Sequence, residues 1–128
     1  MASQRAAHIH SSCGIALLGL TAICVSACSE EPPRIGRDLP SAFADARPIF
    51  DKRVKEHFPI GSDETTLLSE LRTERFKIDT AATPASPYGA SAAFTAHQLV
   101  CKKTWAIFWN TSSGKITAIA GDYGASCL

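Results

Sequence analysis

Hydrophobic and polar positions divide the chain into four stretches of different character. Residues 14–25 are an apolar run with a single threonine, and residues 29–41 are polar and rich in proline. Residues 48–74 carry apolar side chains at helical spacing, whereas residues 94–123 alternate between apolar and polar side chains. The first pair of stretches predicts a leader and a flexible connection, and the second pair predicts a folded domain.

The first helix is predicted over residues 48–57. Pro48 suits the first helical turn, where its missing N–H would have no partner. Phe50 and Val54 are four residues apart and begin an apolar stripe along one side of this helix. Pro59 disfavours helical geometry in the residue before it, so the helix is predicted to end there.

A second helix is predicted over residues 62–74. Ser62 is expected to cap its first turn, and the two acidic residues that follow suit the positive end of the helix dipole. Leu67 and Leu71 lie on one side of the helix and predict its buried face. Residues 76–79 alternate between apolar and charged side chains, which predicts a short strand after the helix.

Three further strands are predicted over residues 94–101, 104–109 and 116–120, the last with room to extend to residue 123. Residues 110–115 predict a hairpin turn, and residues 81–92, rich in proline, glycine and small residues, predict a loop. The element order ααβββ predicts an α+β domain. Two helices would cover one face of an antiparallel sheet of three strands, or of four if residues 76–79 join it.

The middle strand has one bulky face and one lighter face. Ala106 and Phe108 share the lighter face, and the bulkier face is formed by Trp105, Ile107 and Trp109. We predict that the bulkier face packs against the helices, because large apolar side chains gain most from burial. Aromatic residues of a small domain belong to the core by default. If Phe108 and Tyr123 are instead exposed on the outer face of the sheet, they form a candidate partner-binding patch.

The tetrapeptide Val-Ser-Ala-Cys at residues 25–28 directly follows the first apolar run, and Arg5 precedes that run. An apolar run of about a dozen residues suits the core of a signal peptide and is shorter than the about 20 residues needed to cross a bilayer. The tetrapeptide resembles the lipobox of bacterial lipoproteins. The alternative is an ordinary secretory signal with a cysteine nearby.

The lipobox resemblance implies a location and a division of the chain. It implies a lipoprotein signal peptide over residues 1–27, with a diacylglyceryl thioether and an acyl chain such as palmitate on Cys28. Ser29 stands where aspartate commonly signals inner-membrane retention, so the implied location is the outer membrane, facing the periplasm. Residues 28–47 are then a lipid-anchored flexible tether, and residues 48–128 are the folded domain.

Charge and cysteine content narrow the classes of partner. Arg5 is the single charged residue before residue 28, so cleavage would leave twelve basic and twelve acidic side chains. A neutral chain without a basic run disfavours nucleic acid as a partner, and also electrostatic attraction to anionic lipids. With Cys28 acylated, Cys101 and Cys127 are left for each other in an oxidising compartment. We therefore predict a disulfide between them; the alternative is a pair of free buried thiols.

Residue types that carry catalysis or bind metals are sparse. His57 and His97 are far apart in the sequence and no HExxH motif is present, so neither a metal site nor a cofactor is predicted. Ser91 lies in Gly-Ala-Ser-Ala-Ala, which lacks the second glycine of a nucleophile elbow. Glu70 and Glu74, one helical turn apart with arginines nearby, predict a solvated charged face. The sequence predicts no enzyme and no small-molecule substrate.

The predicted domain resembles a known class of small lipoproteins. Gly61 and Ser62 before a helix lined by Leu67 and Leu71, together with a closing hairpin over residues 105–119, are similar to the BamE/SmpA-type outer-membrane lipoproteins and to the related repeats of β-lactamase-inhibitor protein. The resemblance implies two helices on an antiparallel sheet. The Leu-Gly-x-Pro that follows the second helix in that class is replaced by Thr-Glu-Arg-Phe, so a role in assembling outer-membrane barrels is not implied.

Three hypotheses of function follow. The leading hypothesis is a non-catalytic protein-binding or assembly module of the cell envelope. The rival is an inhibitor or immunity lipoprotein that blocks an envelope-attacking hydrolase, with the loop at residues 81–92 entering the hydrolase's cleft. A third class, a hydrolase, requires a pocket in which His57 or His97 faces a carboxylate or a hydroxyl.

Overall fold

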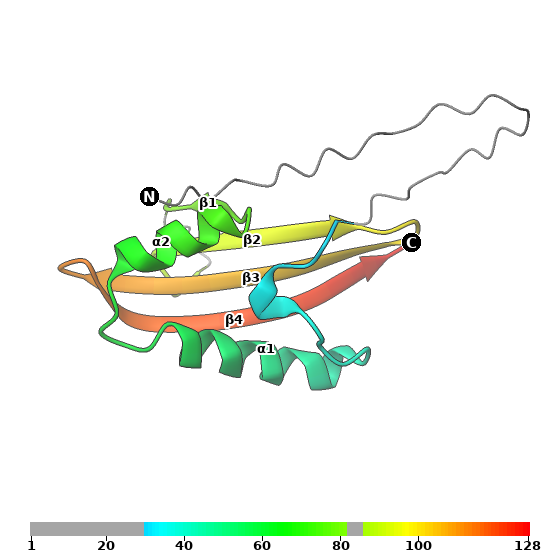
Figure 1. Ribbon diagram of the computed structural model, residues 1–128, viewed down its shortest axis with the longest axis horizontal. Helices are drawn as coiled ribbons and strands as arrows, with labels where there is room; N and C mark the ends of the chain where they lie inside the picture. The colour runs from blue at the N-terminus through cyan, green and yellow to red at the C-terminus, as the bar shows by residue number, and fades with distance from the viewer. Residues whose placement is uncertain (1–29, 82–85) are drawn as a thin grey trace, which may run out of the picture.

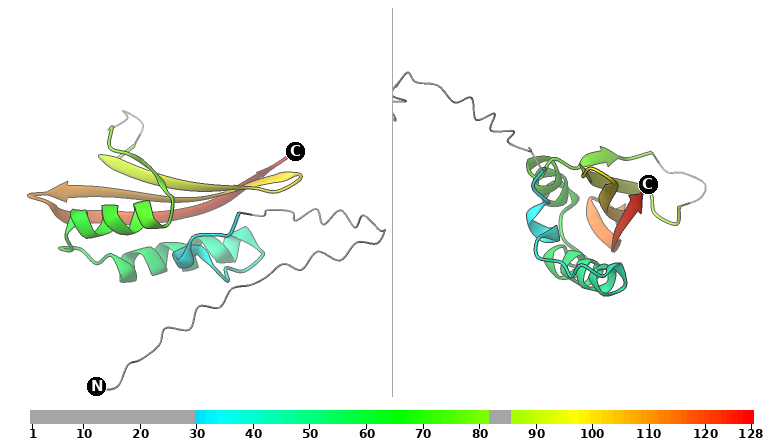
Figure 2. Two further views of the ribbon diagram at one scale, coloured as in Figure 1. Left: turned by 45° about the horizontal axis from the view of Figure 1, so that its top comes forward. Right: turned by 90° about the vertical axis from the view of Figure 1, so that its right-hand side faces the viewer.

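The structure, a computed structural model, describes residues 30–81 and 86–128. A four-stranded antiparallel sheet carries both α-helices on one of its faces (Figures 1 and 2). The helical elements are η1 (Arg34–Gly36), α1 (Phe43–His57) and α2 (Glu64–Thr73). The strands lie in the order β1 (Lys77–Asp79), β2 (Ala90–His97), β3 (Cys101–Ser112) and β4 (Lys115–Cys127). The predicted α+β fold is confirmed, in its four-stranded form.

Helix α1 ends where predicted but begins five residues earlier, at Phe43. Its fully buried side chains are Ala46, Phe50 and Val54, each four residues from the next. Pro48 therefore lies inside the helix, where it removes one backbone hydrogen bond. The burial of Ala46, one turn before Phe50, stabilises the additional turn and explains why the proline does not mark the start of the helix.

Helix α2 begins without the predicted serine cap. The Ser62 hydroxyl donates to the carbonyl of Pro59 at 2.5 Å and makes no cap bond to the helix. Instead, the N–H of Glu64 donates at 2.9 Å to the carbonyl of Gly114, in the β3–β4 turn. A free N–H of the first turn is thus satisfied by a residue 50 positions away, which a local sequence pattern cannot indicate.

Helix α2 ends in a Schellman motif that uses arginine where glycine is common. Arg75 has φ of 63°, in the left-handed region. The N–H of Phe76 donates to Leu71 at 2.8 Å, and that of Arg75 donates to Arg72 at 3.0 Å. The Arg75 guanidinium also lies over the Phe94 ring, 5.6 Å from its centroid. This cation–π contact favours arginine at a position that disfavours most side chains.

Strands β3 and β4 extend beyond their predicted ranges, whereas β2 begins four residues before its predicted start and ends at His97, so the predicted strand over residues 94–101 is wrong for residues 98–101. The β3–β4 hairpin closes through Ser113 and Gly114, which have φ of 51° and 73°, as a two-residue type I′ turn requires. Strand β2 begins at Ala90, inside the predicted loop. The small residues before Phe94 continue its alternation between the two faces of the sheet, so the strand includes them. Strand β4 continues to Cys127, opposite Cys101.

The bulky face of β3 packs against the helices, as predicted. Trp105, Ile107 and Trp109 are each 4% exposed or less. They contact the buried face of α1 and the two inner leucines of α2, Leu67 and Leu71, within one hydrophobic cluster. The alternation of β3 therefore determines which sheet face is covered.

Residues 30–42 pack on the domain, so the prediction of a flexible tether over residues 28–47 is wrong for its described part. Pro33 and Gly36 are buried, and Ile35 packs against the core. A Cβ on Gly36 would lie 2.4 Å from the Trp105 Nε1, so the backbone lies directly on the indole ring. This segment covers the end of the inner sheet face that α1 and α2 leave open (Figure 1).

Glycine at position 121 allows α1 to approach β4. A Cβ on Gly121 would lie 2.8 Å from Val54 Cγ2 and 3.2 Å from the Cα of Asp51. We expect Gly121→Ala to destabilise the fold by about 1–3 kcal/mol, because the backbone of α1 would have to move. The matched control is Gly124→Ala in the same strand, where the nearest atom is 3.8 Å away. Urea unfolding of both variants checks this; equal midpoints would contradict the close packing.

Candidate functional site

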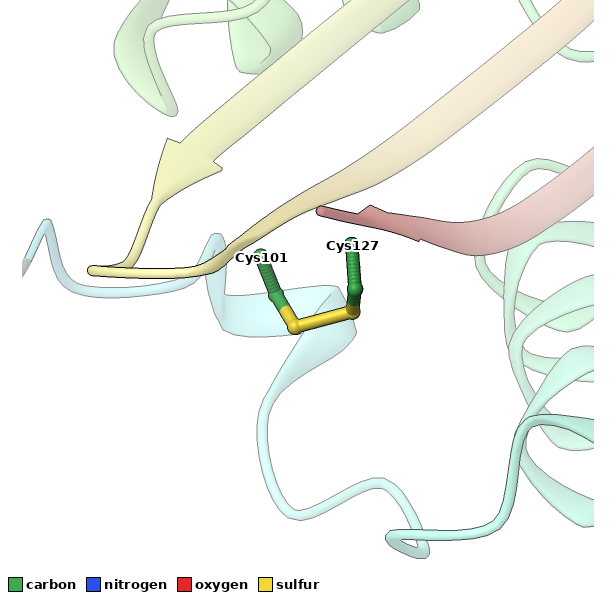
Figure 3. The surroundings of a disulfide bond; sticks show 2 residues. All are labelled: Cys101 and Cys127. Carbon is green, nitrogen blue, oxygen red and sulfur yellow. A yellow bond between two sulfur atoms is a disulfide. The ribbon is translucent and has the colours of Figure 1, made fainter.

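Cys101 and Cys127 form a disulfide across the ends of β3 and β4 (Figure 3). They are directly opposite each other in the register, and their Sγ atoms are 2.08 Å apart. The pairing predicted from the sequence is therefore present in the structure. The disulfide joins the end of β4 to the start of β3 at the end of the sheet opposite the β3–β4 turn (Figure 1).

The outer edge of β4 is protected by side chains of α1. Asp51 accepts a hydrogen bond from the Gly121 N–H at 3.0 Å, and Arg47 donates to the Tyr123 carbonyl at 3.0 Å. Asp51 also accepts from Lys55, and this hydrogen bond, with the charge of Asp51, raises the pKa of Lys55. Free backbone groups of an edge strand can pair with a partner strand, so their occupation disfavours strand addition here.

The sheet face opposite the helices carries no helix of the described chain (Figure 2). Its side chains alternate with the buried ones and are mostly small. They include Ser91, Ala93, Thr95, Thr104, Ala106, Phe108, Asn110, Ala118, Ala120, Asp122 and Gly124. We call this surface the open face. The large apolar side chain among them is Phe108, which is half-buried.

Phe108 has an aromatic partner from the loop before β2. The rings of Tyr88 and Phe108 have centroids 5.9 Å apart, and both side chains are half-buried. Asn110 positions this partner: its Oδ1 accepts from the Gly89 N–H at 2.6 Å, and its Nδ2 donates to the Pro87 carbonyl at 3.2 Å. Two neighbouring outward side chains of β3 therefore hold an aromatic pair on the open face.

Tyr123 does not belong to this surface: it lies in the core, as expected by default, and the alternative in which it is an exposed partner-binding residue is wrong. It is 5% exposed and lies on the inner face, opposite Trp105 in the register. Its ring contacts Trp105 and Phe43, with centroids 5.1 and 5.4 Å apart. Burial raises the pKa of the Tyr123 hydroxyl. Tyr88 takes its place as the second aromatic residue, and no local sequence pattern indicates it.

A pocket of about 370 Å³ lies between η1, the end of α1 and α2. Its apolar lining includes Phe58, Leu71 and Phe76, and on its rim His57 Nε2 lies 2.5 Å from Glu70 Oε2. The structure thus shows His57 facing a carboxylate in a pocket, which is one requirement of a hydrolase. The residues that line this pocket include no serine, threonine or cysteine, so no hydroxyl or thiol side chain of the lining lies beside this pair.

The remaining candidates for chemistry are spread over the surface. Glu74 accepts a hydrogen bond from the Arg34 N–H at 2.7 Å, so it fixes η1 to α2. His97 is exposed at the end of β2, on the open-face side. Glu70 and Glu74 thus each have a partner, and both contacts lie at the solvent-exposed surface, in keeping with the charged face predicted from the sequence. These contacts hold elements together, and none of them brings a base to a nucleophile.

Metal-binding and membrane-spanning features were sought in the part of the chain that the structure describes. There, no group of three or more His, Cys, Asp or Glu residues could hold a metal ion. No helix within residues 30–81 and 86–128 is long and apolar enough to cross a membrane. The acylation predicted at Cys28 and the middle of the predicted loop, residues 82–85, lie outside the described residues.

No family model, curated protein or solved structure matches this chain. Function must therefore be inferred from the geometry of the described residues. That geometry offers the aromatic pair on the open face, and a pocket beside η1 whose lining includes no serine, threonine or cysteine.

Proposed function

We propose that this protein is a non-catalytic protein-binding module of the bacterial cell envelope, held at the periplasmic face of the outer membrane by acyl chains on Cys28. The observation that carries the proposal is the open face. The described chain leaves one side of a disulfide-linked four-stranded sheet without a covering helix, and a positioned aromatic pair, Tyr88 and Phe108, lies on that side. The partner is an envelope protein that covers this face.

The aromatic pair on the open face suits protein binding. Aromatic residues are enriched at protein interfaces, and a few of them near the centre of an interface carry most of the binding free energy. Phe108 lies between Ser91 of β2 and Ala120 of β4, which are its register partners. The two hydrogen bonds from Asn110 hold the Tyr88 segment before binding, so less conformational entropy would be lost on association.

The location rests on residues 25–28, which resemble a lipobox. Two acyl signals or more hold a protein stably to a membrane, whereas a single chain does so only marginally. We expect Cys28→Ala to move the protein from the membrane fraction to the soluble periplasmic fraction. Absence of labelled palmitate from the wild-type protein would contradict the anchor, independently of any partner.

The binding face can be tested in cells with a photoreactive amino acid. Placed at Ala106, beside Phe108 on the open face, it is expected to yield a discrete crosslinked envelope protein. Placed at Glu56, on the solvent side of α1, it is the matched control and should not yield that product. Phe108→Ala should lower the yield from Ala106 about tenfold or more, because an aromatic centre of an interface contributes about 2 kcal/mol or more. Equal yields from both positions would contradict the assigned face.

A second candidate function is the inhibition of an envelope-attacking hydrolase, as an inhibitor or immunity lipoprotein. The observation that favours it is the Tyr88 segment, which extends the open face with a loop held to β3 through Asn110. The same crosslinking experiment separates the two candidates by the partner recovered. A hydrolase whose activity is blocked by the purified protein, and restored by deleting the loop, supports inhibition.

A further inference from the structure

The most exposed aliphatic side chains of the described chain include three at one end of the sheet. Leu99 and Val100, in the β2–β3 turn, are 104% and 63% exposed, and Leu128 beyond β4 is 111% exposed. The N–H of Leu128 donates to the Val100 carbonyl at 3.0 Å, so these residues are neighbours. We call Leu99, Val100 and Leu128 the apolar tip.

Two lysines flank the apolar tip. Lys102 lies on the open-face side of the sheet and Lys103 on the helix side. No aspartate or glutamate occurs in residues 96–104 or 123–128. Neither lysine takes part in an ion pair within the described chain. These strand ends therefore carry two lysines and no acidic side chain, although the chain after cleavage carries equal numbers of basic and acidic side chains.

The apolar tip is held firmly by covalent and backbone contacts. The disulfide between Cys101 and Cys127 lies directly beneath it (Figure 3). The β2–β3 turn is closed by two backbone hydrogen bonds between Gln98 and Cys101, at 2.8 and 3.1 Å. The leucine and valine side chains of the tip are exposed and do not pack against the hydrophobic core of the fold. They are therefore free to enter an apolar phase outside the protein.

The position of Glu30, where the described chain starts, limits how far the domain can lie from an anchor at Cys28. The described chain starts at Glu30, which lines a surface hollow with Phe94 and Thr95 of β2, toward the same end of the sheet as the tip (Figures 1 and 2). Two residues span at most about 7 Å. Since Pro33 is already buried, an acylated Cys28 would place this end of the domain at the membrane surface.

We infer that the apolar tip inserts into the lipid headgroup region of the membrane that holds the anchor, so that the strands extend away from the membrane and the open face is accessible in the periplasm. The inference rests on the proposed acylation of Cys28. Leucine and valine side chains would enter the acyl boundary, while Lys102 and Lys103, on opposite faces of the sheet, would reach anionic headgroups. The lipid surface is favoured over a protein partner because apolar side chains and cations are gathered at the end nearest the anchor.

The test uses the acylated protein in vesicles of phosphatidylethanolamine and phosphatidylglycerol with brominated acyl chains. Leu99→Trp places a fluorophore at the tip. Ile60→Trp is the matched control, because Ile60 is an aliphatic residue, 63% exposed, in the α1–α2 loop at the other end of the sheet. The native Trp105 and Trp109 are buried and give both variants the same background.

We expect tryptophan at position 99 to lose most of its fluorescence to brominated lipid and to emit at a shorter wavelength, and tryptophan at position 60 to do neither. Adding Lys102→Glu and Lys103→Glu should reduce the quenching at position 99. If the protein floats with the vesicles but is quenched equally at both positions, or at neither, insertion of the tip is contradicted and the anchor is retained. If the protein fails to float, both the anchor and the insertion of the tip are contradicted. An emission shift at position 99 that requires a membrane protein assigns the tip to that protein and also overturns the inference.

Discussion

Replacing Trp109 with alanine is expected to destabilise the fold by about 3–5 kcal/mol, the usual cost of truncating a buried aromatic side chain. Trp109 has no exposed surface, and its Nε1 donates to Glu64 Oε1 at 2.9 Å. The substitution would leave a cavity between β3 and α2 and would remove the donor from Glu64. For a domain of this size the melting temperature should fall by roughly 15–30 °C.

The neighbouring residue provides the matched control. Phe108 lies on the opposite face of the same strand and is half-buried, so Phe108→Ala is expected to cost well under half as much. Thermal and urea unfolding of both variants measure the difference. Trp109→Ala should therefore reduce folding, whereas Phe108→Ala should reduce partner crosslinking in a folded protein. A larger loss of stability for Phe108→Ala would reverse the assignment of the two faces.

This pair also shows why the sheet could be predicted from the sequence. Side chains alternate across a strand, so the bulky side of β3 had to face the core once any helices were present. The same alternation places Phe108 outward without any knowledge of the rest of the chain. The face to which a strand side chain points depends on its place in the local alternation, and this face was predicted correctly for residues 105–109.

The alternation could not assign Tyr123 to a face, because its strand was predicted to end near that position. With a short β4, Tyr123 could be assigned to either face. In the structure a register shift between Asn110 and Thr111 separates the start of β4 from its remainder, and Tyr123 pairs with Trp105 on the inner face. A bulge changes which residues point inward, and nothing in the composition of residues 115–123 indicates it.

Contacts between distant residues explain the other differences. Residues 30–42 contain few apolar side chains, yet Gly36 packs directly on Trp105, nearly 70 positions later. Tyr88 reaches Phe108 because Asn110 binds the backbone on both sides of it. A proline-rich polar segment reads as a tether when only its own composition is considered. Its packing depends on the uncovered end of a sheet that forms from later residues.

Removing the disulfide is the second change with a large expected effect. The cysteines are 26 residues apart, and a cross-link of that separation stabilises a protein by roughly 3–4 kcal/mol when it restricts the unfolded chain. We expect Cys101→Ala with Cys127→Ala to lose about this much. The loss should be largest at the apolar tip, because the disulfide is the one covalent link between the strand ends that carry Val100 and Leu128. Hydrogen exchange at these two amides should accelerate more than at Trp109.

The reductant supplies the control for this prediction. Reducing the acylated wild-type protein, in which the Cys28 thiol would be blocked, should lower its unfolding midpoint to that of the double variant. The same treatment should leave the double variant unchanged, because it has no cross-link to break. Two reactive thiols in the denatured, unreduced wild-type protein would show that the cysteines are free. A stable reduced tip would in turn mean that backbone hydrogen bonds alone fix Leu99 and Val100 in place.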